Sequence, residues 1–312
     1  MDDQGLPQLR EIDTSFETIE FGVQYLKKQL EPKCDFNYLQ KLYERKEPLS
    51  AIVLCDGSGA RVAMKAGIEI VVVGFSDGVP EGIPNEKSAS LTDAVDAVDA
   101  VRSANNFSFL IGDIPYVSYK REEDLVKVSK LLMSAGANAV KVEGGCEVSA
   151  LVEELTLLDI PVVGHIGYMP KTDMPMRLRG TTKEDFESLY KDAKALVEAG
   201  AKALVLELVH SEAAGYLTQK LNVPTVGVYS GGGTSGQALV LNDILDLTYF
   251  DPKSFPKGKP KAIGEWKGTP VERVSAFKRL VKSNEFPFCT RFVKPKLTLD
   301  QMWTSFGGSH YQ

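Results

Sequence analysis

A repeated segment is the feature that most constrains the fold of this chain. AGIEIVVVG from Ala66, AGANAVKVEGG from Ala135 and AGAKALVLE from Ala199 are near-copies of one pattern. The last two follow residues 122–134 and 184–198, where apolar residues recur every three or four positions, as in an amphipathic helix. The Ala-Gly pair would end such a helix, because glycine readily takes the left-handed C-terminal conformation. Each copy therefore predicts a helix, a turn and a strand.

The predicted strands favour a closed barrel. They are mostly β-branched or aliphatic without strict polar alternation, which is typical of strands covered on both faces of a parallel sheet. Four further candidate strands begin at Ala51, Phe107, Pro161 and Pro224, and an eighth is expected near residues 244–248. This strand count, spread over residues 51–282, favours an α/β fold of the (β/α)8 TIM-barrel type over a doubly wound open sheet.

Three parts are expected along the chain. Residues 1–47 predict an N-terminal helical extension, in which 16–30 and 38–45 have helical patterns joined by a proline-containing turn. Residues 48–286 form the predicted catalytic barrel. The C-terminal tail, 287–312, contains prolines, a Gly-Gly pair and several aromatic residues, and is expected to cover a neighbour or to remain flexible.

Composition and charge narrow the class of protein. With 312 residues and 43% apolar content, the chain can bury a large core. Its net charge of -6 argues against a nucleic-acid partner, which would call for a basic surface. The four cysteines show no metal-type spacing, the acidic start resembles no targeting signal, and no apolar run is long enough for a bilayer. We expect a cytoplasmic enzyme with reduced thiols and no membrane partner.

Polar residues follow several of the predicted strands. In a barrel of this type catalytic groups lie at the carboxyl ends of the strands. The residues at those positions are Asp56, Asp113, Glu143, His165 and Glu207. Any one of the acids could instead cap the following helix, and a single buried histidine more often has a structural role. Their recurrence at comparable positions favours a functional site.

The strand-end carboxylates suggest a metal-assisted reaction on a 2-oxo acid. Lys141 and Glu143 are two residues apart, so both should point to the same face of their strand. Carboxylate oxygens suit Mg²⁺, which usually takes one or two protein carboxylates plus substrate and water, and Asp113 and Glu143 are the candidate ligands. Such an ion, or another divalent metal, could stabilise the enolate of a 2-oxo acid, with Glu207 as the base. Asp113 and His165 are also candidate substrate-binding residues.

The segment GGGTSG, residues 231–236, literally contains the GxGxxG pattern of dinucleotide-binding proteins. It lacks a convincing βαβ context and a following ribose-binding acid. A tight backbone turn is the better interpretation.

The strand-end motifs also carry a family resemblance. Over residues 51–287 the chain resembles the ketopantoate hydroxymethyltransferase family, barrel enzymes of the phosphoenolpyruvate mutase and isocitrate lyase superfamily. The segments that carry the likeness are, in order, IGDIPY around Asp113, KVEGG around Glu143, GHIGYMP from Gly164, LVLELV around Glu207 and TSGQALVLND at 234–243.

The resemblance implies a reaction and a role for each site residue. Asp113 and Glu143 would belong to the Mg²⁺ site, Lys141 and Ser76 would contact the 2-oxo acid, and Glu207 would accept a proton. The implied reaction is enolisation of 3-methyl-2-oxobutanoate and attack on the one-carbon unit of 5,10-methylenetetrahydrofolate, which gives ketopantoate for pantothenate synthesis. The family's habit also implies a homo-oligomer.

Two departures from the family pattern bear on this expectation. The family's second strand ends in VGDS, whose Asp is a metal ligand, but this chain has VGFSDG and places Phe75 there. Asp77 or Asp56 could substitute, although neither position guarantees ligand geometry. The phenyl ring could also form an apolar wall for a bulkier substrate. After His165, YMPKTDMPMRLRGTT replaces a longer glycine-rich segment of the family.

The departures leave two alternatives open. The chain could be a diverged superfamily lyase, decarboxylase or isomerase that forms the same enolate on another 2-oxo acid without folate. It could also be a non-catalytic barrel that has lost its metal.

Overall fold

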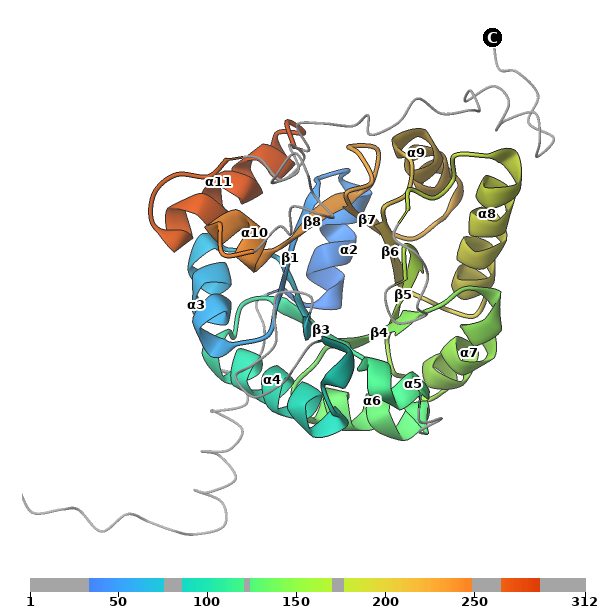
Figure 1. Cartoon of the computed structure of the whole chain (residues 1–312), viewed down its shortest axis with the longest axis horizontal. Coiled ribbons are helices and arrows are strands. Elements are labelled where there is room, and N and C mark those ends of the chain that lie inside the picture. Colours follow the sequence, from blue (N-terminus) through green and yellow to red (C-terminus); the bar gives the residue numbers. More distant parts are fainter. Residues whose placement is uncertain (1–33, 76–85, 121–123, 170–176, 249–264, 287–312) are drawn as a thin grey trace, which may run out of the picture.

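Eight parallel strands close into a barrel in the computed structural model, which describes residues 34–75, 86–120, 124–169, 177–248 and 265–286 (Figure 1). Each strand pairs in parallel with the next, and the last pairs with the first. The strands are β1 Leu49–Leu54, β2 Ile70–Val73, β3 Phe109–Asp113, β4 Ala139–Glu143, β5 Val162–Gly167, β6 Ala203–Glu207, β7 Thr225–Val228 and β8 Gly236–Val240. The predicted (β/α)8 fold is confirmed, and an open sheet is excluded.

Most of the helices surround the barrel (Figure 1). In the part of the chain that the structure describes, the helices are α2 Phe36–Glu44, α3 Gly57–Ala66, α4 Leu91–Ala104, α5 Tyr116–Lys120, α6 Leu125–Ser134, α7 Ser149–Leu157, α8 Lys183–Glu198, α9 Ser211–Lys220, α10 Leu241–Leu245 and α11 Pro270–Lys282, with short 3-10 turns at Glu86–Ser88 and Cys146–Val148. The repeated Ala-Gly pairs end α3, α6 and α8 as predicted. Gly67, Gly136 and Gly200 have φ of 70°, 112° and 102°, a range that favours glycine.

The strands are buried on both faces, which explains their continuous apolar sequences. On β4, Val140 and Val142 belong to the apolar layer between strands and outer helices. The alternate residue Ala139 belongs to the cluster inside the barrel, and Lys141 lines the barrel interior. Because side chains alternate along a strand, Glu143 shares the inward face with Lys141, as the spacing predicted.

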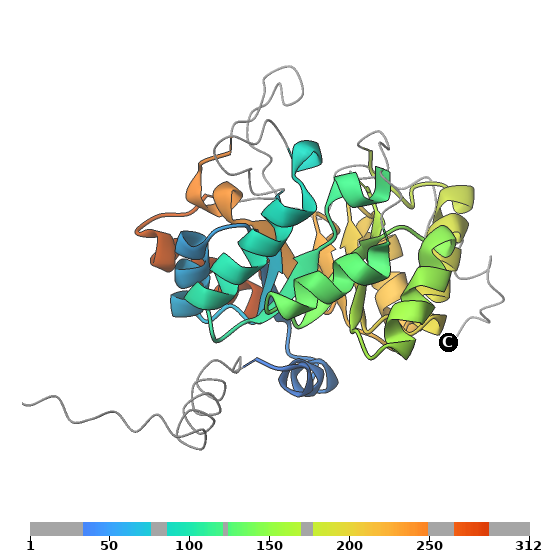
Figure 2. The ribbon, with the colours of Figure 1, turned by 90° about the horizontal axis from the view of Figure 1, so that it is seen from below.

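Helix α2 lies across one end of the barrel (Figure 2). Leu39 and Leu42 join the apolar cluster inside the barrel, and the ring centroids of Phe36 and Phe109 are 6.4 Å apart. The helix begins two residues before the predicted start because Asp35 caps it, accepting the Tyr38 N–H. The predicted helix at 16–30 and the tail at 287–312 lie outside the described residues, and the three-part division of the chain stays a prediction.

The prediction of an eighth strand near residues 244–248 is wrong. That segment overlaps α10, and β8 occupies Gly236–Val240, directly after the glycine-rich turn. Gly236 begins β8 beside β1, where a Cβ would lie 2.5 Å from the Leu49 carbonyl oxygen. Glycine disfavours strands, so a strand that begins with it is hard to predict from sequence. The GGGTSG turn itself is confirmed, and Gly231 adopts a φ of 80° there.

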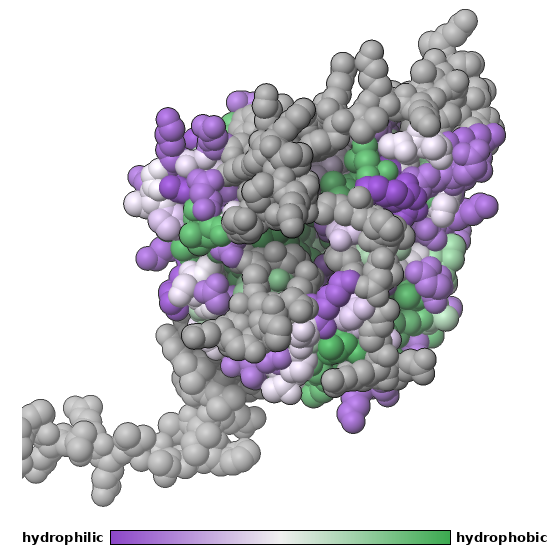
Figure 3. Space-filling view, viewed as in Figure 1, coloured by the Kyte–Doolittle hydropathy of each residue, from purple (hydrophilic) through white to green (hydrophobic). Residues whose placement is uncertain are grey.

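The outer surface carries mostly hydrophilic side chains around its margin (Figure 3), as expected for the solvent side of amphipathic helices. Among the described residues, no helix is both long and apolar enough to cross a membrane.

Candidate active site

The polar side chains predicted from the strand ends meet at the carboxyl end of the barrel. Neighbouring strands place Asp113 beside Lys141 and Glu143 beside His165, and they pair Gly167 with Glu207. Asp113, Lys141, Glu143 and His165 are buried, whereas the Glu207 side chain is 23% exposed. The structure therefore brings together five of the predicted site residues, and Glu207 is the member that reaches solvent.

Lys141 and Asp113 form a buried ion pair, with Nζ 3.1 Å from Oδ2. Burial alone would lower the pKa of Lys141, but the negative charges of Asp113, Glu143 and Glu207 outweigh it, so the pKa lies above its ordinary value. The site thus holds a fixed ammonium group.

His165 lies between two glutamates. Its Nδ1 is 3.4 Å from Oε2 of Glu143, and its Nε2 is 3.3 Å from Oε2 of Glu207. Burial and the nearby Lys141 lower the pKa of His165, but the two carboxylates outweigh them and the pKa is raised above its ordinary value. An imidazolium at this position would connect the buried carboxylate to the partly exposed one.

Tyr119 of the short helix α5 fixes the end of β4, a contact that the sequence did not indicate. Its buried hydroxyl accepts the backbone N–H of Glu143 at 3.0 Å. Burial raises the pKa of Tyr119, so the hydroxyl stays neutral. Only the three-dimensional fold joins this tyrosine to a backbone 24 residues away.

Phe75 points away from the site. Along β2, Val71 and Val73 belong to the apolar layer outside the barrel, and Phe75, 7% exposed, belongs to the same cluster. The inward position is Gly74, where a Cβ would lie 3.0 Å from Oδ2 of Asp113. The phenyl ring is therefore a core residue, and the hypothesis that it forms an apolar wall for substrate is wrong.

Asp56, another candidate ligand, has a structural role instead. Oδ1 of Asp56 accepts the N–H groups of Ser58 and Gly59, which makes this residue the N-cap of α3, the structural role already considered for strand-end acids. Ser76 and Asp77 lie outside the described residues.

The chemistry of the donor set fits a hard cation with few protein ligands. Asp113 and Glu143 offer two carboxylates, as many as Mg²⁺ usually takes from a protein. Within the described residues, no group of three His, Cys, Asp or Glu side chains could hold a metal ion. A cation at Asp113 and Glu143 would therefore depend on water and substrate for its remaining ligands.

An arginine that the sequence analysis did not single out braces the rim of the site. The buried Arg179 donates from Nε to Oδ1 of Asp185 at 2.7 Å and from a terminal nitrogen to the carbonyl of Gly167 at 3.1 Å. Its backbone also bonds to Leu208 and His210. This residue lies in the segment after His165 that departs from the family pattern, of which residues 170–176 are outside the described part.

Tyr229 adds an aromatic wall next to Glu207. It follows β7 with a φ of 52°, a left-handed conformation that is unusual for a bulky residue and often marks functional sites. Its hydroxyl donates to Oδ2 of buried Asp243 at 2.5 Å, and Oδ1 of Asp243 accepts from Thr248 at 2.6 Å. Burial and Asp243 raise the pKa of Tyr229 well above its ordinary value. No sequence motif indicated the contact between Tyr229 and Asp243.

Solved structures similar to this one share its fold. A putative phosphonomutase from Burkholderia cenocepacia J2315 has a TM-score of 0.53 at 14% identity, covering 64% of this chain and 89% of its own. Oxaloacetate acetylhydrolase in complex with 3,3-difluorooxalacetate has a TM-score of 0.51 at 14% identity, covering 82% of this chain and 97% of its own. At these identities the likeness concerns the fold alone.

Curated relatives are much closer in sequence. A 3-methyl-2-oxobutanoate hydroxymethyltransferase from Ignicoccus hospitalis is 39% identical over 82% of this chain and 97% of its own length. The protein of the same name from Pyrococcus abyssi is 38% identical over 78% of this chain and 86% of its own length. The family model described as ketopantoate hydroxymethyltransferase matches residues 33–288. This chain belongs to the ketopantoate hydroxymethyltransferase family of enzymes.

Proposed function

We propose that this protein is a 3-methyl-2-oxobutanoate hydroxymethyltransferase that serves pantothenate synthesis. In this reaction a hydroxymethyl group passes from 5,10-methylenetetrahydrofolate to the 2-oxo acid. The observation that carries the proposal is the chain of contacts from Glu143 through His165 to Glu207, beside the ammonium group of Lys141. It supplies a base and a fixed positive charge within one site.

Lys141 binds and polarises the substrate. A 2-oxo acid carries a carboxylate next to a ketone, and enolisation adds negative charge to the ketone oxygen. The pKa of Lys141 is raised, so its ammonium group is present throughout the neutral range to attract both groups. A preorganised charge in a buried site stabilises such a transition state more than it would in water. Its pairing with Asp113 holds the ammonium in position.

Glu207 accepts the proton from C3 of the substrate. It is the one glutamate of the His165 contacts whose side chain reaches solvent, so a substrate can approach it. As the C3–H bond breaks, its electron pair forms the C2–C3 double bond and the carbonyl electrons move to oxygen. C3 then bonds to the one-carbon unit, whose two C–N bonds to the folate break as it gains the bond to C3 and a hydroxyl from water. The folate nitrogens take up the proton from C3 and one from the water, so the products are ketopantoate and tetrahydrofolate.

His165 orients the base. Its ring nitrogens face Glu143 and Glu207, so the charge of an imidazolium would attract the Glu207 carboxylate towards this position. Asp113 and Glu143 are the residues that would hold a divalent cation. When bound, such a cation would supply Lewis-acid stabilisation of the enolate oxygen. With Phe75 turned into the core, we expect that cation to bind weakly in the absence of substrate.

Product analysis tests the proposal. Purified protein is incubated with 3-methyl-2-oxobutanoate and Mg²⁺, with and without 5,10-methylenetetrahydrofolate, and products are identified by mass. Ketopantoate that forms only with the folate supports the transferase. Cleavage, decarboxylation or isomerisation without folate would instead identify a lyase or isomerase acting through the same enolate.

A matched pair of variants ties the activity to this site. Lys141→Met should lower kcat/KM by roughly two to three powers of ten, the usual effect of removing one electrostatic donor from a reacting centre. Lys194→Met, on the exposed face of α8, removes the same charge far from the site and should leave kcat/KM unchanged. Equal activities in the two variants would contradict the assignment of Lys141.

A further inference from the structure

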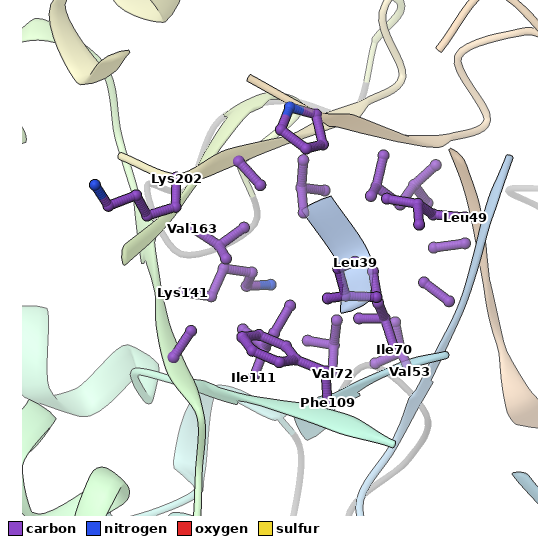
Figure 4. Close-up of a pocket in the computed structure, with 18 of the residues that line it drawn as sticks. Leu39, Leu49, Val53, Ile70, Val72, Phe109, Ile111, Lys141, Val163 and Lys202 are labelled. Atoms are coloured by element: carbon purple, nitrogen blue, oxygen red, sulfur yellow. The ribbon is translucent and has the colours of Figure 1, made fainter. Parts of the chain in front are cut away.

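An apolar cavity of about 100 Å³ lies inside the barrel (Figure 4). At one end it is lined by Phe36 and Leu39 of α2, and at the other by Lys141, Glu207 and Tyr229. It therefore extends from the end of the barrel that α2 covers to the candidate active site. The interior of such a barrel is normally filled by layers of bulky side chains, so a cavity there needs a structural explanation.

Alanines at inward positions leave this space open. Four of the eight strands contribute one alanine each to the cavity wall, and these are Ala51, Ala139, Ala203 and Ala238. A valine or leucine at any of these positions would fill part of the volume. The size is of the same order as the roughly 150 Å³ apolar cavity that suffices to bind benzene.

The cavity opens beneath the reacting groups. In Figure 4 the ammonium group of Lys141 points into the cavity, whereas Lys202 points away from it. Glu207 lines the cavity and is also partly exposed, so it stands at the boundary between the barrel interior and solvent. A molecule held by Lys141 with its reacting carbon at Glu207 has apolar space on one side and the open mouth on the other.

The volume of the cavity determines how the two substrates can be oriented. A folate is far too large for a cavity of about 100 Å³, so the one-carbon donor must approach from the mouth. The alkyl part of the 2-oxo acid is then left with the apolar side, where burial stabilises it and no polar group loses water.

We propose that the barrel interior binds the alkyl chain of aliphatic 2-oxo acids longer than 3-methyl-2-oxobutanoate. The position of the head group rests on the proposed function, with the carboxylate and ketone at Lys141. The chain extends past Val163 and Ile111 towards α2. The substrate class is thus set by the interior alanines as well as by the residues at the mouth.

A homologous series of ligands tests the proposal. Dissociation constants are measured by calorimetry for unbranched 2-oxo acids from 2-oxobutanoate to 2-oxooctanoate. Each methylene that enters the cavity should tighten binding about fourfold, until the cavity is full and the constants level off. Constants that do not change with chain length would overturn the proposal.

Substitutions of alanines test whether the gain in affinity with chain length arises inside the barrel. Ala51→Val fills part of the cavity at a position distant in sequence from the catalytic groups. Binding should then stop tightening at a shorter alkyl chain of the ligand. Ala203→Val makes the same change on another strand and serves if Ala51→Val fails to fold. Ala97→Val is the matched control, because Ala97 is a buried alanine in the layer outside the barrel. A control that shortens the series equally would contradict the assignment.

The binding series and the turnover assay fail independently. Tighter binding with chain length but no ketopantoate would leave the cavity proposal standing and overturn the transferase. Folate-dependent formation of ketopantoate, together with dissociation constants that do not change with chain length, would support the transferase and overturn the cavity proposal. If none of the acids binds, both proposals fall.

Discussion

Nζ of Lys141 lies 3.1 Å from Oδ2 of Asp113, and their side chains are only 10% and 5% exposed. Removing two charges from water is costly, and their mutual attraction has to repay it. Loss of Lys141 would leave the Asp113 carboxylate buried without the ammonium group that pairs with it. The pair therefore links the stability of the barrel to the charge arrangement of the site.

Lys141→Met should destabilise the fold by about 3–5 kcal/mol, the usual cost of breaking a buried pair from one side. The double variant Lys141→Met, Asp113→Leu should lose less than the sum of the two single changes, because neither member of the pair is left without the other. Denaturant unfolding measures all three. Lys194→Met, whose partner Glu198 lies on the exposed face of α8, should cost at most about 0.5 kcal/mol. Additive losses at Lys141 and Asp113 would show that the pair is not coupled.

Phe75→Asp places the family's acidic residue in this chain, and we expect it to harm the fold. The side chain packs in the apolar layer with residues such as Val73, so the change removes a buried ring and introduces a charge. The loss should be at least about 3–5 kcal/mol, the range for removing a buried aromatic ring. Phe75→Leu, the conservative control, should cost far less. Calorimetry with Mg²⁺ should show no gain in affinity, and a tight new metal site would contradict the outward orientation.

Asp185 should make stability depend on pH in the acid range. Burial alone would raise its pKa, but Arg177, Arg179 and the Gly180 N–H outweigh it and the pKa is lowered. A lowered pKa in the folded state stabilises the protein above the ordinary Asp pKa of about 3.9 and is lost as pH falls through the folded value. Wild type should exceed Asp185→Asn by about 2 kcal/mol at pH 7, with a shrinking margin below pH ~4.

Unfolding measured from pH 7 to the acid limit checks this expectation. Asp96→Asn, on the exposed face of α4, is the matched control and should differ from wild type by no more than about 0.5 kcal/mol throughout. A margin for Asp185→Asn that grows as pH falls would have the opposite sign to the one expected.

Two cysteines should differ sharply in reactivity. Burial, and then the negative charge of Glu69, raise the pKa of Cys34 to about 12, whereas Cys146 is exposed. At pH 8 the thiolate fraction of Cys34 is on the order of one in ten thousand, and the thiolate is the reactive species. Brief alkylation followed by peptide mass analysis should modify Cys146 and leave Cys34 intact, and unfolding should remove the difference. Early modification of Cys34 would show that α2 does not protect this end of the barrel.

The fold was predictable where local rules and the barrel architecture agree. The Ala-Gly pairs mark helix ends because glycine alone takes the required backbone conformation easily, and three such ends gave the repeat. The two-residue spacing of Lys141 and Glu143 predicted their common face because strand side chains alternate. The sequence did not predict β8, because the strand begins with Gly236 and glycine has little strand preference. Glycine is needed at this position because the Leu49 carbonyl lies too close for a Cβ.

The site was only partly predictable, because its contacts depend on register between strands. The sequence named His165 and both glutamates, but their mutual distances follow from how β4, β5 and β6 align. Alignment by motif placed Phe75 at a ligand position, although its ring belongs to the apolar layer outside the barrel and Gly74 lies next to Asp113. Tyr119 and Tyr229 come from other parts of the chain, and no local pattern connects them to the strand ends.

The most direct test of the account is proton exchange at C3 of 3-methyl-2-oxobutanoate in deuterated water with Mg²⁺, followed by NMR without folate. Wild type should exchange the proton, and Glu207→Gln should slow exchange by 10²–10⁴-fold, the usual contribution of a general base. Glu154→Gln, an exposed glutamate on α7, should exchange at the wild-type rate. Exchange that persists in Glu207→Gln at the wild-type rate would contradict the central claim that Glu207 removes the substrate proton.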